Sequence, residues 1–322
     1  MQQVRKSSKS KWQWLLLIPG LVLAACRDDA EVPPTAPTQV TLPGNTFYPE
    51  SVHASADGTL YIGSFMTGEI VRVPADISRA EQFHAPGADG VVAVLGVLVD
   101  DARQKLWVCA VDTSGKTPPR IKSFSLENGA QVDDIGFPQA AFPNDLALDP
   151  AGNLFVTDSA GGVIYRLPSG GSSLQKWAED ARWVPSPGEF SLDGIVIADP
   201  ENIFVNLFTR GELYRVKQKA DGTAGEVTTV TVSPALSLPD AMRRIDETSF
   251  YVVQGTGELS RVTVNADGKM ATSTSIRTGL DQPTSVAIVG GTAWVTEGQL
   301  LRLFASPPEQ PRIPFMLRSV DL

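Results

Sequence analysis

The chain has 322 residues, of which 27 are Lys or Arg, 36 are Asp or Glu, and only two each are Cys and His. A net charge of −9 without a basic run in the body of the chain argues against a nucleic-acid-binding protein. Two cysteines are too few for a disulfide framework, and 28 Gly with 24 Pro favour many turns over long helices.

Residues 1–25 have the composition of an export signal. A basic segment precedes the apolar run WLLLIPGLVLAA, which is too short and too interrupted for a good membrane span. The run ends in LAAC at residues 23–26, which resembles a bacterial lipobox. We therefore predict a lipoprotein signal peptide over residues 1–25 and lipidation of Cys26. An ordinary signal peptide with an incidental Cys is the alternative.

Cleavage before Cys26 removes four basic residues and leaves 23 basic against 36 acidic ones, a net charge of −13 that suits cation binding. Residues 26–37 are polar and Pro-containing, and we predict a tether there. A lipid on Cys26 would hold the protein on a membrane surface without a spanning helix. Arg27, rather than Asp, follows the Cys, and by the usual enterobacterial sorting pattern this favours the outer membrane, facing the periplasm. We expect a monomer attached to the cell envelope by its anchor.

The body of the chain repeats one pattern, in which an alternating strand is followed by a polar turn and a second apolar strand. Six segments show it: YPESVHASADGTLYIGS, VLGVLVDDARQKLWVCAVD, FPNDLALDPAGNLFVTDS, LDGIVIADPENIFVNLF, LPDAMRRIDETSFYVVQ and QPTSVAIVGGTAWVTEG. Several continue into a third strand, such as GEIVRV (68–73), GELYRV (211–216) and QLLRL (299–303). Cys109, in KLWVCAV, is expected to be a buried small hydrophobe.

The repeat spacing of 44 to 49 residues, with about four strands per unit, is typical of a β-propeller. We predict an all-β, six-bladed β-propeller with four-stranded antiparallel blades over residues 38–322. Two independent β domains would not give such even spacing. The fourth strand of the last blade could come from residues 39–43, from residues 314–320, or from both ends.

One position of the repeat marks the entry of each first strand. It is occupied by Glu50, Leu95, Asn144, Asp193, Asp240 and Thr284. Because the first strands of a propeller line its central channel, these side chains should form a ring at one mouth. Three carboxylates there would repel one another and lose hydration. One divalent cation would relieve this, with Ca²⁺ favoured and Zn²⁺, Mn²⁺ or Mg²⁺ as alternatives. A simply hydrated channel is the other interpretation.

Other residues near this mouth have less specific roles. Asp145 is expected to cap neighbouring backbone amides, and His53 to be a packed residue. The long connection RWVPSPGEFSL (182–192) could overhang the channel. Aromatic and polar residues of the loops between the second and third strands, such as Phe65 and Asp158, should rim the mouth and suit a small polar ligand.

The motifs PESVHASADGTLYIGS, PNDLALDPAGNLFVTDS and LPDAMRRID resemble the senescence marker protein, gluconolactonase and luciferin-regenerating enzyme (LRE)-like family, over nearly all of residues 40–305. Members of that family are six-bladed propellers, and the active ones hydrolyse sugar lactones or related esters around one divalent ion. NHL-type and strictosidine-synthase-like propellers have similar strand–turn–strand repeats.

The resemblance implies metal ligands at Glu50, Asp193 and Asp240, with Asp193 standing where the family has Asn. It also implies that Asn144 and Asp145 bind substrate. The family's substrate-binding Arg, shortly before that pair, is missing from AAFPND. This argues against sugar-lactone specificity.

The resulting functional prediction is a gluconolactonase-like, metal-dependent hydrolase of a lactone or related ester. The cation would polarise the carbonyl and Asp240 would activate water as general base. Asn144 would orient the small-molecule substrate. The alternative is a non-catalytic, envelope-tethered binding or scaffold propeller. A lyase with a His base is disfavoured because neither His falls at the mouth.

Overall fold

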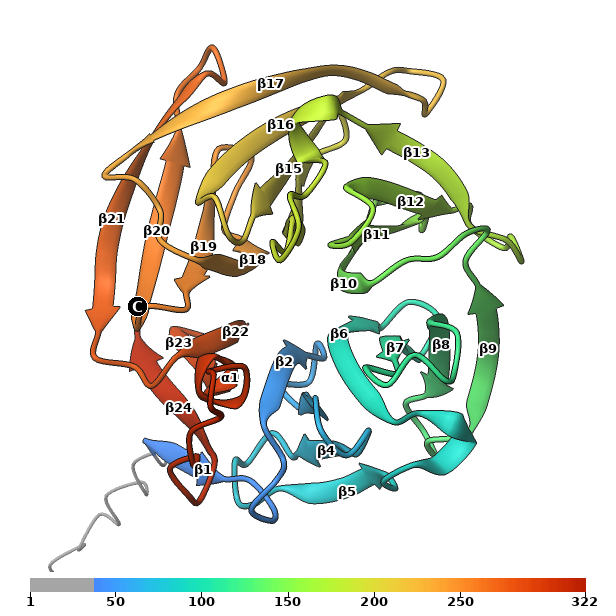
Figure 1. The fold of residues 1–322 in the computed structure, drawn as a ribbon, viewed down its shortest axis with the longest axis vertical. Helices are drawn as coiled ribbons and strands as arrows, with labels where there is room; N and C mark the ends of the chain where they lie inside the picture. Colours follow the sequence, from blue (N-terminus) through green and yellow to red (C-terminus); the bar gives the residue numbers. More distant parts are fainter. Residues whose placement is uncertain (1–37) are drawn as a thin grey trace, which may run out of the picture. The chain divides into compact units, whose positions relative to one another are not determined.

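The computed structural model describes residues 38–322, which form sheets that follow one another in chain order around a central axis (Figure 1). Over residues 38–322 the fold is nearly all-β, with one short α-helix and two 3₁₀ turns, at Ala88–Gly90 and Ala181–Trp183. No helix in this part of the chain has the length and hydropathy to cross a membrane. The predicted signal peptide, Cys26 and the tether lie outside the described residues.

Three sheets are each built from four strands that are consecutive in the chain and pair antiparallel. The first has β2 (Pro49–Ala54), β3 (Leu60–Ser64), β4 (Ile70–Val73) and β5 (Glu81–His84). The second has β6 (Ala93–Asp100), β7 (Lys105–Val111), β8 (Arg120–Ser125) and β9 (Gln131–Gly136). The third has β10 (Pro143–Leu148), β11 (Leu154–Asp158), β12 (Val163–Leu167) and β13 (Gln175–Glu179).

The next eight strands belong to one sheet made of two antiparallel halves. One half has β14 (Leu192–Asp199), β15 (Asn202–Leu207), β16 (Glu212–Gln218) and β17 (Ala224–Ser233). The other has β18 (Pro239–Arg244), β19 (Ser249–Gln254), β20 (Glu258–Val264) and β21 (Met270–Thr278). The halves meet where the long outer strands β17 and β21 pair in parallel over three residues, Thr231–Ser233 with Met270–Thr272.

The last sheet uses both ends of the described chain. It has β22 (Pro283–Val289), β23 (Thr292–Glu297), β24 (Met316–Asp321) and, outermost, β1 (Gln39–Thr41). The two terminal segments are thus the third and fourth strands. Our prediction that residues 299–303 form the third strand is wrong: Leu300–Leu303 is the helix α1, after a left-handed Gln299 (φ 57°). Five residues of QLLRL are too few for alternation to distinguish a strand from a helical turn.

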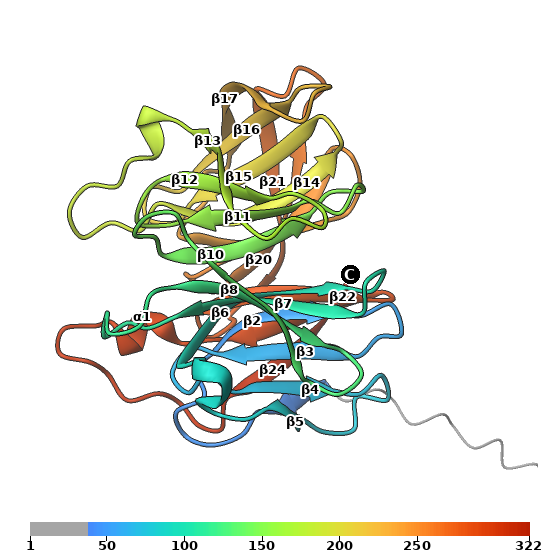
Figure 2. The ribbon, with the colours of Figure 1, turned by 90° about the vertical axis from the view of Figure 1, so that its right-hand side faces the viewer.

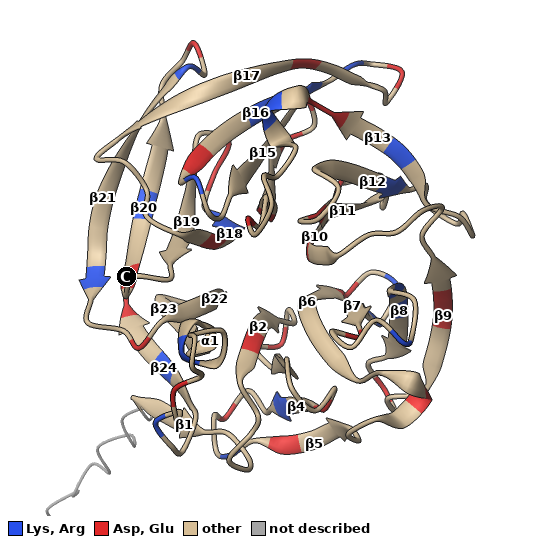
Figure 3. Cartoon of the chain, viewed as in Figure 1, with Lys and Arg blue, Asp and Glu red and all other residues tan. Residues whose placement is uncertain are grey.

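The first strands of all these units surround the axis. β2, β6, β10, β14, β18 and β22 contact one another in that order, and β22 returns to β2. Apolar side chains pack between neighbouring sheets, among them the fully buried Tyr165, Phe155 and Trp183. Cys109 is fully buried in β7, as predicted. Figure 3 shows charged residues on the outer strands and acidic residues on the inner strands β2, β10 and β18. The inner strands carry several buried acidic residues, among them Glu50, Asp145, Asp193 and Asp240.

Candidate functional site

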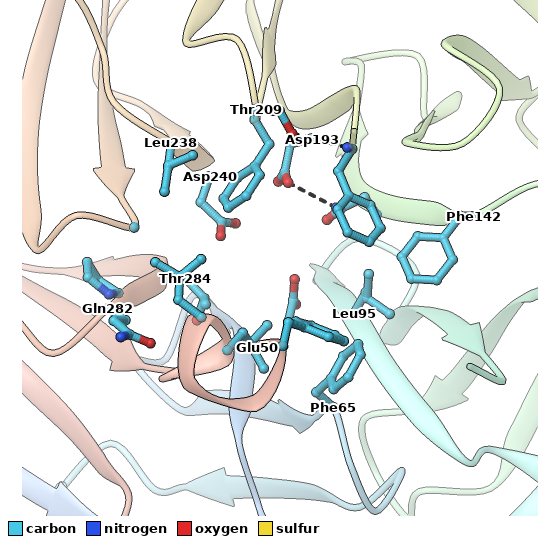
Figure 4. A pocket seen from close by; sticks show the side chains of 18 of the residues that line it. Glu50, Phe65, Leu95, Phe142, Asp193, Thr209, Leu238, Asp240, Gln282 and Thr284 are labelled. Carbon is cyan, nitrogen blue, oxygen red and sulfur yellow. Dashed lines mark hydrogen bonds between the residues drawn. The ribbon is translucent and has the colours of Figure 1, made fainter. Parts of the chain in front are cut away.

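All of the aligned entry positions line a single pocket of about 310 Å³ at one mouth of the ring (Figure 4). These residues are Glu50, Leu95, Asn144, Asp193, Asp240 and Thr284. In Figure 4 the carboxyl groups of Glu50, Asp193 and Asp240 point toward one another across this space. The structure therefore brings together residues that lie as far as 234 positions apart, and it does so at the mouth that the repeat predicted.

Each entry position lies in a β-bulge or similar irregularity of the inner strand. The register shifts fall between Pro49 and Ser51, Val94 and Val97, Pro143 and Leu146, Leu192 and Ile195, Pro239 and Met242, and Pro283 and Ser285. A bulge breaks the strict alternation of side chains and re-aims one of them. This explains how a polar side chain can face the channel in a strand that is otherwise built for burial.

The chain enters three of these strands through a strained residue before proline. Tyr48, Leu238 and Gln282 have φ angles of 43°, 51° and 52°, in the left-handed region that such side chains seldom adopt. The carbonyl oxygen of each accepts a backbone hydrogen bond from a residue one or two positions after the second strand of its unit: Phe65 at 3.0 Å, Gly255 at 2.8 Å and Gln299 at 3.2 Å. These bonds fix the entry of the strands that carry Glu50, Asp240 and Thr284.

Hydrogen bonds hold the carboxyl groups of the ring. The Asn144 side chain donates from Nδ2 to Oδ2 of Asp193 at 3.1 Å and to Oγ of Ser159 at 3.1 Å. The backbone N–H of Ala241 donates to Oδ1 of Asp240 at 2.9 Å. Oδ1 of Asp193 is buried and has no partner in the described part of the chain.

Burial raises the pKa of all three acids, whose residues are only 5 to 7 % exposed. For Asp193, burial and the nearby Asp145 raise the pKa to about 8. For Asp240, burial followed by the charges of Asp193 and Glu50 raises the pKa well above its usual range. The pKa of Glu50 is also raised well above its usual range by burial and by Asp193, against a smaller opposing effect of Arg243. Such a cluster binds protons more strongly than free carboxyl groups do, and a cation would compete with those protons.

The ring contains the kinds of side chain that bind a hard cation. Carboxyl groups and the amide oxygen of Asn144 are the donors that Ca²⁺ accepts, and the unpartnered Oδ1 of Asp193 is a free acceptor. Within residues 38–322, however, no three Asp, Glu, His or Cys side chains are positioned to hold one ion between them. The residue types fit a cation, and binding one would require the three carboxyl groups to lose protons and close around it.

Asp145 faces the channel one layer below the ring. It is 3 % exposed, its Oδ1 accepts from the N–H of Leu146 at 2.9 Å, and its Oδ2 accepts from Ile195 N at 3.4 Å. The amide-capping role expected of Asp145 is present. Its third partner was missed: Arg243 in β18 donates from Nη1 to Oδ2 at 3.2 Å.

Arg243 could have been found from the repeat. It lies three positions after Asp240, where other repeats have His53, Leu98, Ala147, Val196 and Ala287. Most of the other repeats have an apolar residue at this position, so an arginine here indicates a functional or structural role inside the channel. Burial, followed by the charge of Arg243, lowers the pKa of the partly buried His53 to about 3, so its imidazole is neutral at physiological pH. Its Nδ1 lies 3.0 Å from the carbonyl oxygen of Ala54.

Aromatic side chains form the outer wall of the pocket, and the sequence indicated only part of it. Phe65 and Phe190 come from the loop and the long connection that were predicted at the mouth. Phe142, Phe208 and Phe304 were missed. Other predicted rim residues have structural roles. Asp158, for example, is fully buried and its Oδ1 accepts from the backbone N–H of Phe142 at 2.8 Å.

The sequence matches no family model and no curated protein. Solved structures do match it. They include a gluconolactonase from Xanthomonas campestris (TM-score 0.62, 17 % identity, covering 88 % of this chain and 87 % of that one). Aldose sugar dehydrogenase from Streptomyces coelicolor in its PQQ-bound form matches with a TM-score of 0.61 and 17 % identity over 88 % of this chain and 96 % of that one. Virginiamycin B lyase from Staphylococcus aureus matches with a TM-score of 0.58 and 13 % identity over 88 % and 98 %.

These proteins are β-propellers, and the likeness places this chain in that fold class. A gluconolactonase is thus among the structural neighbours of a chain whose motifs resemble that family. At such low identity the likeness concerns the fold alone, because one fold supports many activities.

Proposed function

We propose that residues 38–322 form a six-bladed propeller of the gluconolactonase-like family that hydrolyses a lactone or related ester with the aid of a divalent cation, Ca²⁺ by preference. One observation carries the proposal. Three acids that occupy the same repeat position, Glu50, Asp193 and Asp240, converge in one pocket with raised pKa values. Perturbed carboxyl groups gathered in a cleft are typical of functional sites.

In this proposal Glu50, Asp193 and Asp240 hold the cation, which when bound would polarise the substrate carbonyl. Asp240 also takes a proton from the attacking water. One of its oxygens is fixed by the N–H of Ala241, which leaves the other to act. Asn144 orients the substrate and holds Asp193 in place. The carboxyl group of Asp145 already has three partners, so we assign it a positioning role through Arg243 instead of direct substrate contact.

We further propose that the protein is an exported lipoprotein. Lipidated Cys26 and residues 26–37 would tether a monomeric propeller to the outer membrane on its periplasmic side. The substrate would then be a small molecule of the cell envelope.

A non-catalytic binding propeller is the second candidate. The arrangement of the carboxyl groups favours it, because within residues 38–322 no three acidic side chains are positioned around one ion. In that case the acids would remain protonated and the pocket would bind a ligand without turnover.

Thermal unfolding of the full-length protein separates the two candidates. Melting is measured in EDTA and then with Ca²⁺, Mg²⁺, Mn²⁺ or Zn²⁺. A cation that binds only the folded state at a hundred times its dissociation constant adds about 2.7 kcal/mol of stability. We expect a shift that disappears in Asp240→Ala, and lactone or ester turnover that disappears in Asp240→Asn while the fold is kept. No shift with any cation would contradict the metal site and favour the binding propeller.

A further inference from the structure

Two segments of the chain reach over the pocket and narrow its mouth. We call them the Phe190 lip (residues 182–190, between β13 and β14) and the Phe304 lip (residues 299–304, which include α1). Figure 2 shows α1 and the connection between β13 and β14 projecting on the same side of the molecule. Both segments contribute to the lining of the pocket, through Phe190 and through Leu300, Leu301 and Phe304.

The Phe190 lip is fixed by the turn between β15 and β16. Arg210 of that turn pairs with Glu189 at 2.8 Å and donates to the carbonyl oxygen of Arg182 at 2.6 Å. The N–H of Phe190 donates to Oγ1 of Thr209 at 3.1 Å. Side chains that could otherwise meet a polar ligand are thus used to hold Phe190 in position.

The Phe304 lip is fixed in a similar way. Arg302 pairs with Asp281 at 2.7 Å, and its N–H donates to Oε1 of Gln282 at 3.2 Å. The side-chain amide of Gln299 exchanges two hydrogen bonds with the backbone of Arg312, at 2.8 and 2.7 Å. The lip is therefore an ordered element, and it presents Phe304 toward the opposite side of the mouth.

Phenylalanine rings join the two lips to the walls. The centroids of Phe190 and Phe304 lie 6.5 Å apart, Phe304 contacts Phe65 at 5.5 Å, and Phe190 contacts Phe142 at 5.7 Å. Phe190 is 41 % exposed and Phe304 is 55 % exposed. Large apolar side chains that are held at a mouth with so much exposed surface indicate an apolar ligand.

Few polar groups are available to a hydroxylated ligand. Apart from the ring of entry positions, the only polar side chains lining the pocket among residues 38–322 are Thr209 and Gln282, and each already accepts a hydrogen bond from a lip. The hydroxyl groups of a sugar lactone would lie against phenyl rings and lose their hydrogen bonds to water, which is unfavourable.

We propose that the substrate is an apolar lactone or ester, with an acyl or aryl part packed against the phenyl rings of the Phe190 and Phe304 lips and its carbonyl directed to the carboxyl ring. For the type of reaction, this inference rests on the proposed function. For the substrate class, it rests on the two lips and on the aromatic walls of the pocket. At about 310 Å³ the pocket is at the small end of the range for small-molecule sites, about 300–1,000 Å³. A medium-length chain is therefore the expected size.

The test compares γ-lactones of increasing length, from γ-butyrolactone to γ-dodecalactone, with glucono-δ-lactone on the full-length protein. We expect kcat/KM to rise up to about fourfold per added methylene until the pocket is filled, and glucono-δ-lactone to be a poor substrate. In the double variant Phe190→Ser/Phe304→Ser this rise should become flat. The double variant Val132→Ser/Met270→Ser, which changes two exposed apolar residues on outer strands, should keep the wild-type rise.

A second series makes the inference independent of turnover. Non-hydrolysable γ-lactams of the same chain lengths are titrated by calorimetry. If no lactone is hydrolysed but lactam affinity rises with chain length and falls in Phe190→Ser/Phe304→Ser, the hydrolase proposal fails and the apolar site stands. If lactones are hydrolysed but neither series depends on chain length, or if glucono-δ-lactone is the best substrate, the hydrolase proposal stands and the apolar substrate class is overturned.

Discussion

Arg243 and Asp145 form a buried ion pair, Nη1 to Oδ2 at 3.2 Å, one layer below the carboxyl ring. Their side chains are 11 % and 4 % exposed. The pair joins β18 to β10, and Nη2 of Arg243 also donates to the carbonyl oxygen of Val52 in β2 and to Oγ of Ser285 in β22, each at 3.3 Å. One guanidinium thus links four inner strands from inside the channel.

We predict that Arg243→Met lowers the free energy of unfolding by about 3–5 kcal/mol, because it leaves the Asp145 carboxylate buried without its counter-charge. Urea unfolding measures this. Adding Asp145→Asn to that variant should recover part of the loss. Lys176→Met, which removes the exposed pair with Glu179, should change stability by less than about 1 kcal/mol. If the Arg243 and Lys176 substitutions lowered the free energy of unfolding equally, burial would not determine how much the Arg243–Asp145 pair contributes to stability.

Asp193→Asn is predicted to act in opposite directions on the free protein and on its cation complex. Asp193 is the acid that stands where the related family has Asn, and its Oδ1 has no partner among the described residues. An amide can still accept from Nδ2 of Asn144, and because it cannot ionise it never adds a negative charge to the buried cluster. We expect melting in EDTA to rise by a few degrees, roughly 1 kcal/mol, and the shift on adding Ca²⁺ to become smaller. A lower melting temperature in EDTA would contradict this account.

His53 should make the protein less stable in mild acid. Its pKa in the folded state is about 3 because of burial and the charge of Arg243, whereas an unfolded His titrates near 6.5. The unfolded state therefore binds a proton first as pH falls. The stability contribution of neutral His53 is complete above pH 6.5 and is lost as pH falls toward 3.

The measurement is urea unfolding of the wild type and of His53→Gln at pH 7 and pH 4.5. The wild type should lose up to about 2 kcal/mol more than the variant between these pH values. The charge that shifts the pKa of His53 is that of Arg243, which is paired with Asp145. Since both are common to the two proteins, the difference isolates the imidazole. Parallel pH profiles would show that His53 is protonated with little cost in the fold.

The repeat predicted the inner part of the site because periodicity identifies equivalent backbone positions. Glu50 and Asp240 could be aligned since each follows a proline at the entry of a first strand, and equivalent positions of a closed ring must converge. The same alignment could have identified Arg243, had the layer three residues further along each strand been compared.

The outer wall could not be predicted in this way. Phe190 and Phe304 lie in segments without an equivalent in the other repeats, and their positions depend on ion pairs such as Arg210–Glu189 and Arg302–Asp281. Such pairs join residues about 20 positions apart whose spacing follows no period. Residues 299–303 were misassigned for a related reason: the short apolar run serves the pocket instead of a sheet.

Gly194, directly after Asp193, shows how closely the inner strands approach at the site. A Cβ added there would lie 2.4 Å from the carbonyl oxygen of Asp240 and 2.9 Å from Nδ2 of Asn206. Asn206 bridges the two strands, accepting from the N–H of Gly194 at 3.1 Å and donating to the carbonyl oxygen of Asp240 at 2.6 Å. This bridge sets the separation of Asp193 and Asp240.

We predict that Gly194→Ala lowers the free energy of unfolding by about 1–3 kcal/mol, as overpacking does, and also reduces the melting shift caused by Ca²⁺. The second effect follows because β14 and β18 must move apart and carry their carboxyl groups with them. Gly291→Ala is the matched control, since a Cβ there meets nothing within 4 Å and its φ is not in the left-handed region. If Gly194→Ala loses stability but keeps the full Ca²⁺ shift, the separation of these two strands does not determine cation binding.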